Sequence, residues 1–228
     1  MFKEKINNYL TKEICICPIF LEKILIKYST EKQLIEEYLE YLIDYSFPYN
    51  YPVIGSLEWH KNDKDYEKYY TSFWENNDIN DEKPYYELFD NFWRIIKHFK
   101  SNGIIFAYEK MDSEDLYYPK IILNKYYGND DDINELDESI TIYRGTSRDE
   151  YDSGDFSQSW SLSYDIAKKF AFEHYIWCKQ GTCRVILKTD ITKSDIFYFN
   201  KNNTEQEVIV NSNKLDKSNI VIVKGKIL

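Results

Sequence analysis

The feature that most constrains the fold is a change in hydrophobic periodicity at an acidic stretch over residues 129–135. Before this stretch, apolar residues recur at helical spacing, as in Leu34, Ile35, Tyr38, Leu39 and Leu42. After it, they come in short β-type runs at 140–143, 184–187, 207–210 and 220–223. This order predicts an α+β fold. We expect a helical N-terminal part over residues 1–135, packed on a strand-rich core over residues 136–228.

Local signals place three helices more closely. Thr30 with Gln33 forms a capping-box pattern at the start of the first. The second begins near Pro84 and ends before Gly103; its apolar face contains Leu88, Phe92, Ile95, Ile96 and Phe99. Between these two, residues 46–83 predict loops with short helical pieces. In the second half, Ser163 is the expected N-cap of a helix with Ile166, Ala167, Phe170 and Ala171 on one face.

Composition limits the classes of partner and the cellular compartment that we expect for this chain. Hydrophobic residues make up 43% of 228 residues, which suffices for one large domain with a buried core. The net charge of -10 argues against broad binding to phosphate backbones, which needs clustered Lys and Arg, but allows a nucleic acid held in a local groove. No apolar run approaches the ~20 residues that cross a bilayer, and the N-terminus lacks the apolar stretch of a secretory signal. We therefore expect a cytoplasmic protein that does not contact membranes.

The residues that most often hold metals or nucleotides form no familiar pattern. Cys15, Cys17, Cys178 and Cys183 lack the two-residue gap of a zinc knuckle. We expect buried free thiols in a reducing compartment, with a metal site shared by the two pairs as the alternative. The three histidines are isolated, and His98 follows a helical apolar pattern that indicates a structural role. The seven glycines form neither a dinucleotide fingerprint nor a phosphate-binding loop, and there is no nucleophile elbow.

Three segments of the second half carry candidate chemistry, namely Tyr143-Arg144-Gly145, Ser159-Trp160-Ser161 and Glu205-Gln206-Glu207. Arg144 ends a β-type run and can pair with a pyrophosphate through its planar fork, while Gly145 lets a ligand approach the backbone. Residues two apart in a strand share a face, so Glu205 and Glu207 would project together, and their repulsion favours a function. Each segment also has an ordinary explanation as a strand end, a helix cap or a solvated acidic face.

The order and spacing of these segments resemble the arginine–serine–glutamate class of mono-ADP-ribosyltransferases, which includes clostridial binary toxins, cholera-type toxins and vertebrate ecto-enzymes. The resemblance covers residues 140–228. It extends to residues 162–171, which fit the helix after the serine motif, and to residues 196–200, where the family has its substrate-recognising turn–turn loop. Trp160 stands in place of the Thr of a Ser-Thr-Ser motif. Two departures are that only 14 residues separate Arg144 from Ser159, and that the helical half contains no motif that aligns with the family.

The resemblance implies a core of two small, packed antiparallel sheets with the substrate NAD between them, and no metal. Glu207 would stabilise the positive charge that develops on the ribose when the nicotinamide bond breaks. Ser159 would orient Glu207 and contact NAD, and Ser161 belongs to the same NAD-binding motif. Arg144 would hold the phosphates, and the backbone of Gly145 would fix the nicotinamide amide.

The remaining roles concern the nicotinamide ring and the acceptor. Phe170 is either a stacking partner for nicotinamide or a core residue of its helix. Glu205 would position or deprotonate the acceptor; a Glu there commonly accompanies protein arginine in the family, so arginine is the first expectation. RNA or DNA is a second candidate acceptor, for which residues 197–199 and Lys201, Asn202 and Asn203 could stack on and contact a strand. Two further hypotheses are a toxin that only hydrolyses NAD and an inactive NAD-binding module.

An active transferase of this kind threatens the cell that makes it. We therefore expect a phage-encoded protein, or the toxin of a toxin–antitoxin or phage-defence system that a neutralising partner holds silent.

Overall fold

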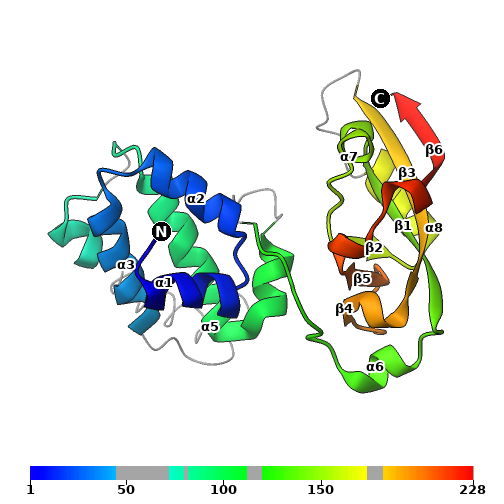
Figure 1. Ribbon diagram of the computed structural model, residues 1–228, viewed down its shortest axis with the longest axis horizontal. Coiled ribbons are helices and arrows are strands. Elements are labelled where there is room, and N and C mark those ends of the chain that lie inside the picture. The colour runs from blue at the N-terminus through cyan, green and yellow to red at the C-terminus, as the bar shows by residue number, and fades with distance from the viewer. Residues whose placement is uncertain (45–71, 80–81, 112–119, 174–181, 228) are drawn as a thin grey trace. The chain divides into compact units, whose positions relative to one another are not determined.

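The computed structural model describes residues 1–44, 72–79, 82–111, 120–173 and 182–227. The chain divides into two compact units, Met1–Ile122 and Leu123–Leu228 (Figure 1). The described part of the first unit is built of helices, and the second combines helices with one antiparallel sheet. The chain therefore combines helices and strands, which is compatible with the predicted α+β class.

The first unit contains α1 Glu4–Asn8, a π-helical turn Tyr9–Glu13, α2 Pro18–Lys27, α3 Lys32–Asp44 and α5 Tyr86–Lys110. The first predicted helix is confirmed as α3, and its side chains Ile35, Tyr38, Leu39 and Leu42 are buried. The Tyr38 ring packs 4.4 Å from the ring of Phe89 on α5, and its hydroxyl donates to the Phe89 carbonyl. In place of the two bonds of a capping box, the Thr30 hydroxyl donates to Glu31 and the Gln33 side chain donates to Glu37.

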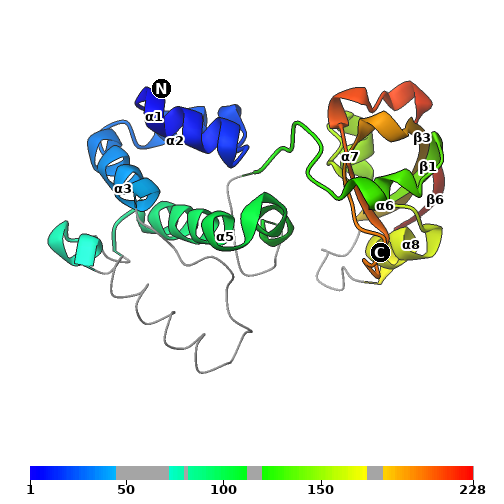
Figure 2. The same cartoon turned by 90° about the horizontal axis from the view of Figure 1, so that it is seen from below.

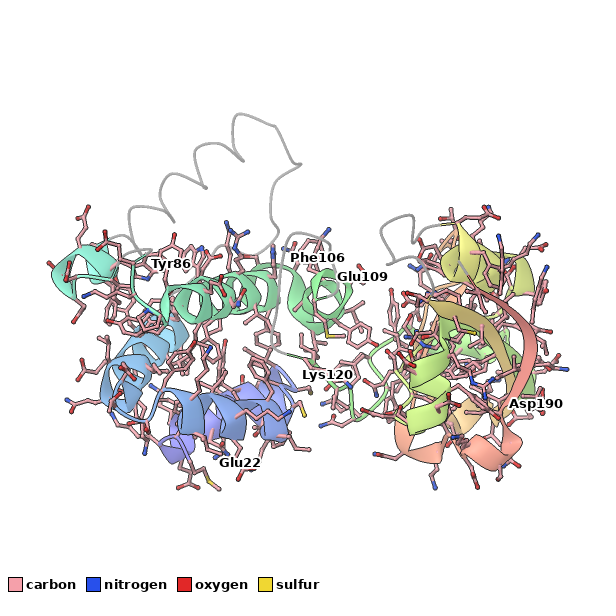
Figure 3. All side chains as sticks on the ribbon, turned by 90° about the horizontal axis from the view of Figure 1, so that it is seen from above. Glu22, Tyr86, Phe106, Glu109, Lys120 and Asp190 are labelled. Carbon is pink, nitrogen blue, oxygen red and sulfur yellow. The ribbon has the colours of Figure 1, made fainter. Side chains whose placement is uncertain are left out.

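The second predicted helix forms the part of α5 that precedes Gly103, and α5 changes direction at that glycine. Gly103 has φ 85° and ψ 179°, which breaks the helical path and bends α5 (Figure 2). In Figure 3, Tyr86 lies near the start of α5, and Phe106 and Glu109 lie beyond the bend. The helical residues resume after Gly103, so the helix bends where we expected it to end. Most of residues 46–83 lies outside the described residues; residues 72–76 are helical, in line with the expected short pieces.

His98 lies just before this bend and has a structural environment. Its ring is 5.2 Å from the ring of Phe106 on the other side of Gly103. Burial, reinforced by Lys97, Lys110 and Arg94, lowers the pKa of His98 to about 4. The side chain is therefore neutral near pH 7, as suits a packing residue.

The second unit contains α6 Asp130–Asn134, β1 Ser139–Ser147, α7 Arg148–Ser153, β2 Ser159–Ser161, α8 Tyr164–Phe172, β3 Cys183–Thr192, β4 Ile196–Phe199, β5 Glu207–Val210 and β6 Val221–Ile227. The four β-type runs are confirmed as β1, β3, β5 and β6. The strands form one six-stranded sheet in the order β4-β5-β2-β1-β3-β6, where two separate sheets were expected. Its halves, β4-β5-β2 and β1-β3-β6, meet at one residue pair, Tyr143 with Ser161.

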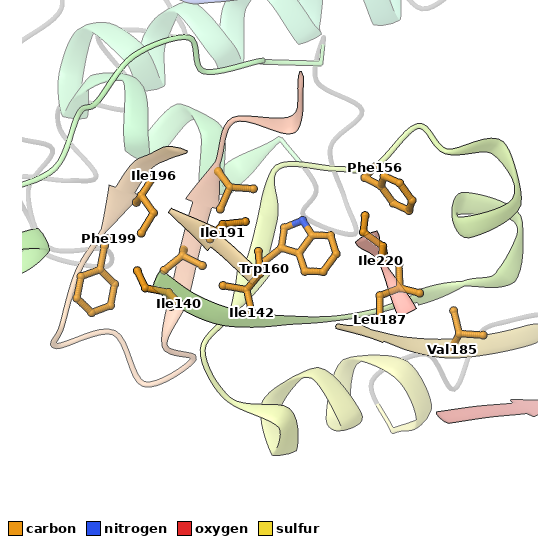
Figure 4. Close-up of a cluster of buried hydrophobic side chains, with 12 residues drawn as sticks. Ile140, Ile142, Phe156, Trp160, Val185, Leu187, Ile191, Ile196, Phe199 and Ile220 are labelled. Atoms are coloured by element: carbon orange, nitrogen blue, oxygen red, sulfur yellow. The ribbon is translucent and has the colours of Figure 1, made fainter. Parts of the chain in front are cut away.

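The two faces of the sheet carry different apolar clusters. One face carries the main core, in which Trp160 lies among Ile142, Leu187 and other strand side chains (Figure 4). Residues on α6 and α7, Ile133 and Tyr151, pack against this core. The opposite face is covered by α8, which buries Ala167 and Ala171 against Ile186. Ser163 caps α8 by accepting from the Ile166 amide, as predicted.

The boundary between the units lies earlier than the expected 135/136 position. Residues 123–135 belong to the second unit because their backbone bonds to it. The Leu123 amide donates to the Gln158 side chain over 2.8 Å. The Tyr127 amide donates to the Phe197 carbonyl over 2.7 Å. Among the described helices, none combines the length and the apolar character needed to cross a membrane.

Candidate active site

The structure brings Ser159 and Glu207 into direct contact. Antiparallel pairing of β2 with β5 sets Ser161 opposite Glu207 and Ser159 opposite Ile209. Strand alternation turns the Ser159 and Glu207 side chains away from the core that holds Trp160. The Ser159 hydroxyl donates to Glu207 Oε1 over 2.5 Å, a short distance for this kind of bond. The contact fixes one carboxylate oxygen of a half-buried glutamate.

Arg144 meets the same serine from the other side. Alternation along β1 places Arg144 on the face of Ile142, so its guanidinium reaches Ser159 at the backbone and not at the hydroxyl. Arg144 Nη1 donates to the Ser159 carbonyl over 2.6 Å. The three expected residues Arg144, Ser159 and Glu207 therefore form one connected chain of contacts across β1, β2 and β5.

Glu150 is a member of this group that the sequence analysis missed. It lies on α7 and accepts from Arg144 Nε over 2.7 Å and from Arg144 Nη2 over 3.1 Å. It also accepts from the Ser157 amide over 3.1 Å and from the Thr146 hydroxyl. Burial alone would raise the pKa of this carboxyl, but the bonds and charge of Arg144, with Thr146 and Ser157, hold the pKa below its ordinary value. Glu150 is therefore ionised at neutral pH.

A local signal for Glu150 does exist in the sequence. Ser147 and Glu150 have the spacing of a capping box, and the Glu150 amide donates to the Ser147 hydroxyl over 3.2 Å. This pattern predicts the start of α7, although it does not predict the ion pair with Arg144. The 14-residue connection between Arg144 and Ser159 thus contains the helix that supplies the partner of Arg144.

The hydroxyl of Ser161 is used within the protein. Ser161 is buried, donates to the Glu205 carbonyl over 2.8 Å and accepts from the Ser163 amide over 3.0 Å. It therefore connects the residues before β5 with the start of α8. The Ser161 hydroxyl therefore has a structural role within the protein, whereas the sequence analysis expected it to contact NAD.

The argument that Glu205 and Glu207 share a strand face is wrong. Strand β5 begins at Glu207, and Gln206 has φ 48°, so the alternation of an extended strand does not reach Glu205. Glu205 is exposed in the preceding loop, where its amide donates to the Asn203 side chain over 2.8 Å. The two carboxylates therefore have different surroundings, one exposed and one half-buried.

The loop before β5 consists of two successive turns. The Asn203 amide donates to the Asn200 carbonyl, and the Gln206 amide donates to the Asn203 carbonyl, each over 3.0 Å. The expected position of the turn–turn loop, residues 196–200, was displaced, because residues 196–199 form the edge strand β4. The turns instead occupy residues 200–206.

Lys201 within this loop is paired with α6 and the residue after it. Its Nζ lies 2.5 Å from Glu135 Oε1 and 3.6 Å from Asp132 Oδ1. The hydrogen bond to Glu135 is the main reason why the pKa of Lys201 is raised. The positive charge that a nucleic-acid strand would need from this loop is therefore partly neutralised within the protein.

Gly145 is required by helix packing. A Cβ on Gly145 would lie 2.0 Å from the Ala167 carbonyl oxygen and 2.5 Å from the Ala171 amide nitrogen. The backbone of α8 thus occupies the space that the sequence analysis reserved for a ligand on that side. The missing side chain is explained by the approach of α8 to β1, and any contact of Gly145 with NAD has to use backbone groups.

Phe170 lies on α8 and is half-buried, outside the apolar cluster that α8 forms with the sheet. Its carbonyl accepts from Nη2 of buried Arg184 over 3.2 Å, and Arg184 Nε donates to the Ala171 carbonyl over 3.1 Å. A cation at the C-terminal turn of a helix is electrostatically favourable. Arg184, which the sequence analysis treated only as part of a strand, therefore holds the end of α8 that carries Phe170.

Three of the four cysteines lie within the described residues. None of Cys15, Cys17 and Cys183 forms a disulfide with a described residue; Cys15 is buried as expected, whereas Cys17 and Cys183 are only partly buried. Cys178 lies outside the described residues. Within the described ranges, no group of three or more His, Cys, Asp or Glu residues is arranged to hold a metal ion.

Comparison of the chain with models of known protein families, with curated proteins and with solved structures finds no match. What the site can do therefore has to be judged from its residues and their contacts.

Proposed function

We propose that the protein is a mono-ADP-ribosyltransferase that cleaves NAD and transfers ADP-ribose to a macromolecule inside the cell. The observation that carries the proposal is the bond from Ser159 to Glu207, with Arg144 bound to the same serine. The three residues come from three separate sequence segments that resemble the family's arginine, serine and glutamate motifs. The contact between the Ser159 hydroxyl and Glu207 is what that chemistry requires, and Arg144 meets the same serine through its backbone carbonyl.

The bond-breaking step falls to Glu207. When the bond between nicotinamide and ribose breaks, its electron pair leaves with nicotinamide, and positive charge develops on the ribose. A fixed carboxylate beside the ribose stabilises that charge, and the bond from Ser159 prevents the carboxylate from turning away. A nucleophile of the acceptor then forms the new bond to the ribose carbon and passes its proton to the Glu205 carboxylate.

NAD would be held by the groups around this pair. Described residues use three of the five N–H donors of Arg144, which leaves two for the phosphates. The backbone of Gly145 would fix the nicotinamide amide, and the half-buried ring of Phe170 would stack on nicotinamide. The two three-stranded halves of the sheet, which meet at a single pair, support the idea that they act as the family's two small sheets.

The loop of residues 200–206 favours a protein arginine as the acceptor. The exposed carboxylate of Glu205 can accept a proton from, and attract, a cationic side chain. Lys201 is already paired with Glu135 and Asp132, which weakens the case for a nucleic-acid acceptor. An enzyme of this activity that acts in the cytoplasm of its own cell would serve as a toxin or a phage-defence effector under the control of a neutralising partner.

The direct test is incubation of the purified protein with labelled NAD and a cell lysate. The labelled product is then divided between protease and nuclease digestion. The proposal expects label that protease releases and nuclease does not. Label that only nuclease releases would move the acceptor to RNA or DNA, nicotinamide release without labelling would favour a glycohydrolase, and neither activity would contradict the proposal.

A further inference from the structure

In the described part of the second unit, the ion pair between Arg144 and Glu150 contains a carboxylate, that of Glu150, which the proposed chemistry does not use. Both side chains are largely buried, with 20% and 16% of their surfaces exposed. The contact is bidentate, from Nε and Nη2 to the two carboxylate oxygens. A bidentate contact fixes the plane of the guanidinium as well as its position.

Glu150 is itself firmly held. Thr146 and the Ser157 amide donate to its carboxylate, and Ser147 caps the helix on which it lies. Thr146 and Ser147 lie at the end of β1, and Ser157 lies in the segment that leads into β2. The carboxylate is therefore a fixed point between the strand that carries Arg144 and the strand that carries Ser159.

The fixed guanidinium has a consequence for the serine. With Nε and Nη2 bound to Glu150, Nη1 points at the Ser159 carbonyl at 2.6 Å. The Ser159 hydroxyl in turn orients Glu207 at 2.5 Å. A continuous chain of bonds thus runs from Glu150 through Arg144 and Ser159 to Glu207.

We infer that Glu150 is a positioning residue for the proposed reaction, which it supports through Arg144 without contacting NAD. The inference rests on the proposed function. In this arrangement Glu150 sets the direction of Arg144, and Arg144 sets the position of Ser159 and of the two N–H donors that remain for phosphate. The loss of Glu150 therefore lowers the rate of nicotinamide release only because it changes the orientation of Arg144. Where Arg144 is absent, the loss of Glu150 has little further effect.

A double-mutant cycle tests this dependence. The variants are Glu150→Gln, Arg144→Lys and the two together, with nicotinamide release measured as kcat and KM. Lysine keeps the charge of Arg144 but cannot form two parallel hydrogen bonds with a carboxylate. Its orientation therefore depends little on Glu150. We expect Glu150→Gln to lower kcat/KM about 10-fold in the wild-type background and less than 3-fold in the Arg144→Lys background, with most of the loss in kcat.

Two further variants keep the test decisive. Glu150→Asp retains the charge and should recover part of the lost activity, and it replaces Glu150→Gln if that variant does not fold. Asp152→Asn removes a carboxylate from the same helix, where it pairs with Arg148 at an exposed position, and should leave kcat/KM within 2-fold of wild type. Thermal unfolding of each variant verifies that it is folded.

The outcomes separate the inference from the proposed function. Equal losses from Glu150→Gln in both backgrounds, or wild-type kcat/KM in Glu150→Gln, would overturn the inference while the transferase proposal stands. A folded wild-type protein that releases no nicotinamide from NAD would overturn both.

Discussion

Replacement of Gly145 by alanine tests whether this glycine serves the packing of α8. The added Cβ would lie 2.0 Å from the Ala167 carbonyl oxygen, whereas ordinary contact begins near 3.4 Å. Helix α8 would therefore have to move by about 1.4 Å. Such a movement strains the bonds from Arg184 to the Ala171 and Phe170 carbonyls.

Overpacking of a core typically costs ~1–3 kcal/mol. Because the clash here is with backbone and not with a side chain that can rotate, we expect the upper end, about 3 kcal/mol. For a domain of ~100 residues this corresponds to a fall in Tm of at least about 10 °C. Gly225→Ala on β6 is the matched control, because its Cβ would meet nothing closer than 3.6 Å.

The assay is urea and thermal unfolding of both variants beside the wild type. If Gly145 is required for packing, the free energy of unfolding should fall strongly in Gly145→Ala and should change by no more than ~0.5 kcal/mol in Gly225→Ala. If Gly145→Ala is as stable as Gly225→Ala and only KM for NAD rises, the packing explanation is refuted. The glycine would then serve ligand approach, as the sequence alone suggested.

Three more variants test separate features of the molecule. Burial lowers the pKa of His98 to about 4, so protons bind the unfolded state first, and the free energy of unfolding should fall by up to about 3 kcal/mol between pH 7.5 and 4. Urea unfolding across this pH range should show a smaller fall in His98→Gln, and an equal fall in both proteins would contradict the assignment. Glu205→Gln should lose acceptor labelling while nicotinamide release to water persists; parallel loss of both activities would end the separation of roles. Cytoplasmic expression should arrest growth and Arg144→Ala should relieve the arrest, whereas normal growth of the native host with the unpartnered wild-type protein would argue against a toxin.

Local signals in the sequence predicted the elements that depend on local interactions. The β-type runs became strands, Ser163 caps α8, and Gly103 marks the position where the helical path breaks, although α5 continues beyond it. The motifs also singled out Arg144, Ser159 and Glu207, and the structure brings Ser159 into contact with both of the others.

What the sequence did not predict depends on contacts between distant residues or on single backbone angles. Glu150 is recognisable as a helix-start residue, but its pairing with Arg144 arises only when α7 packs beside β1. The left-handed φ of Gln206 ends the strand alternation that was applied to Glu205. The need for glycine at position 145 comes from α8, whose approach to β1 no local pattern encodes.

The central claim is that Glu207, held by Ser159, breaks the bond between nicotinamide and ribose. The most direct measurement is nicotinamide release from NAD by Glu207→Gln beside the wild type, with Glu205→Gln as the neighbouring control and with thermal unfolding to verify the fold. Glutamine keeps the shape of the side chain but removes the charge, so we predict a loss of ~10²- to 10³-fold in rate at unchanged Tm. Full activity in a folded Glu207→Gln protein would contradict the account.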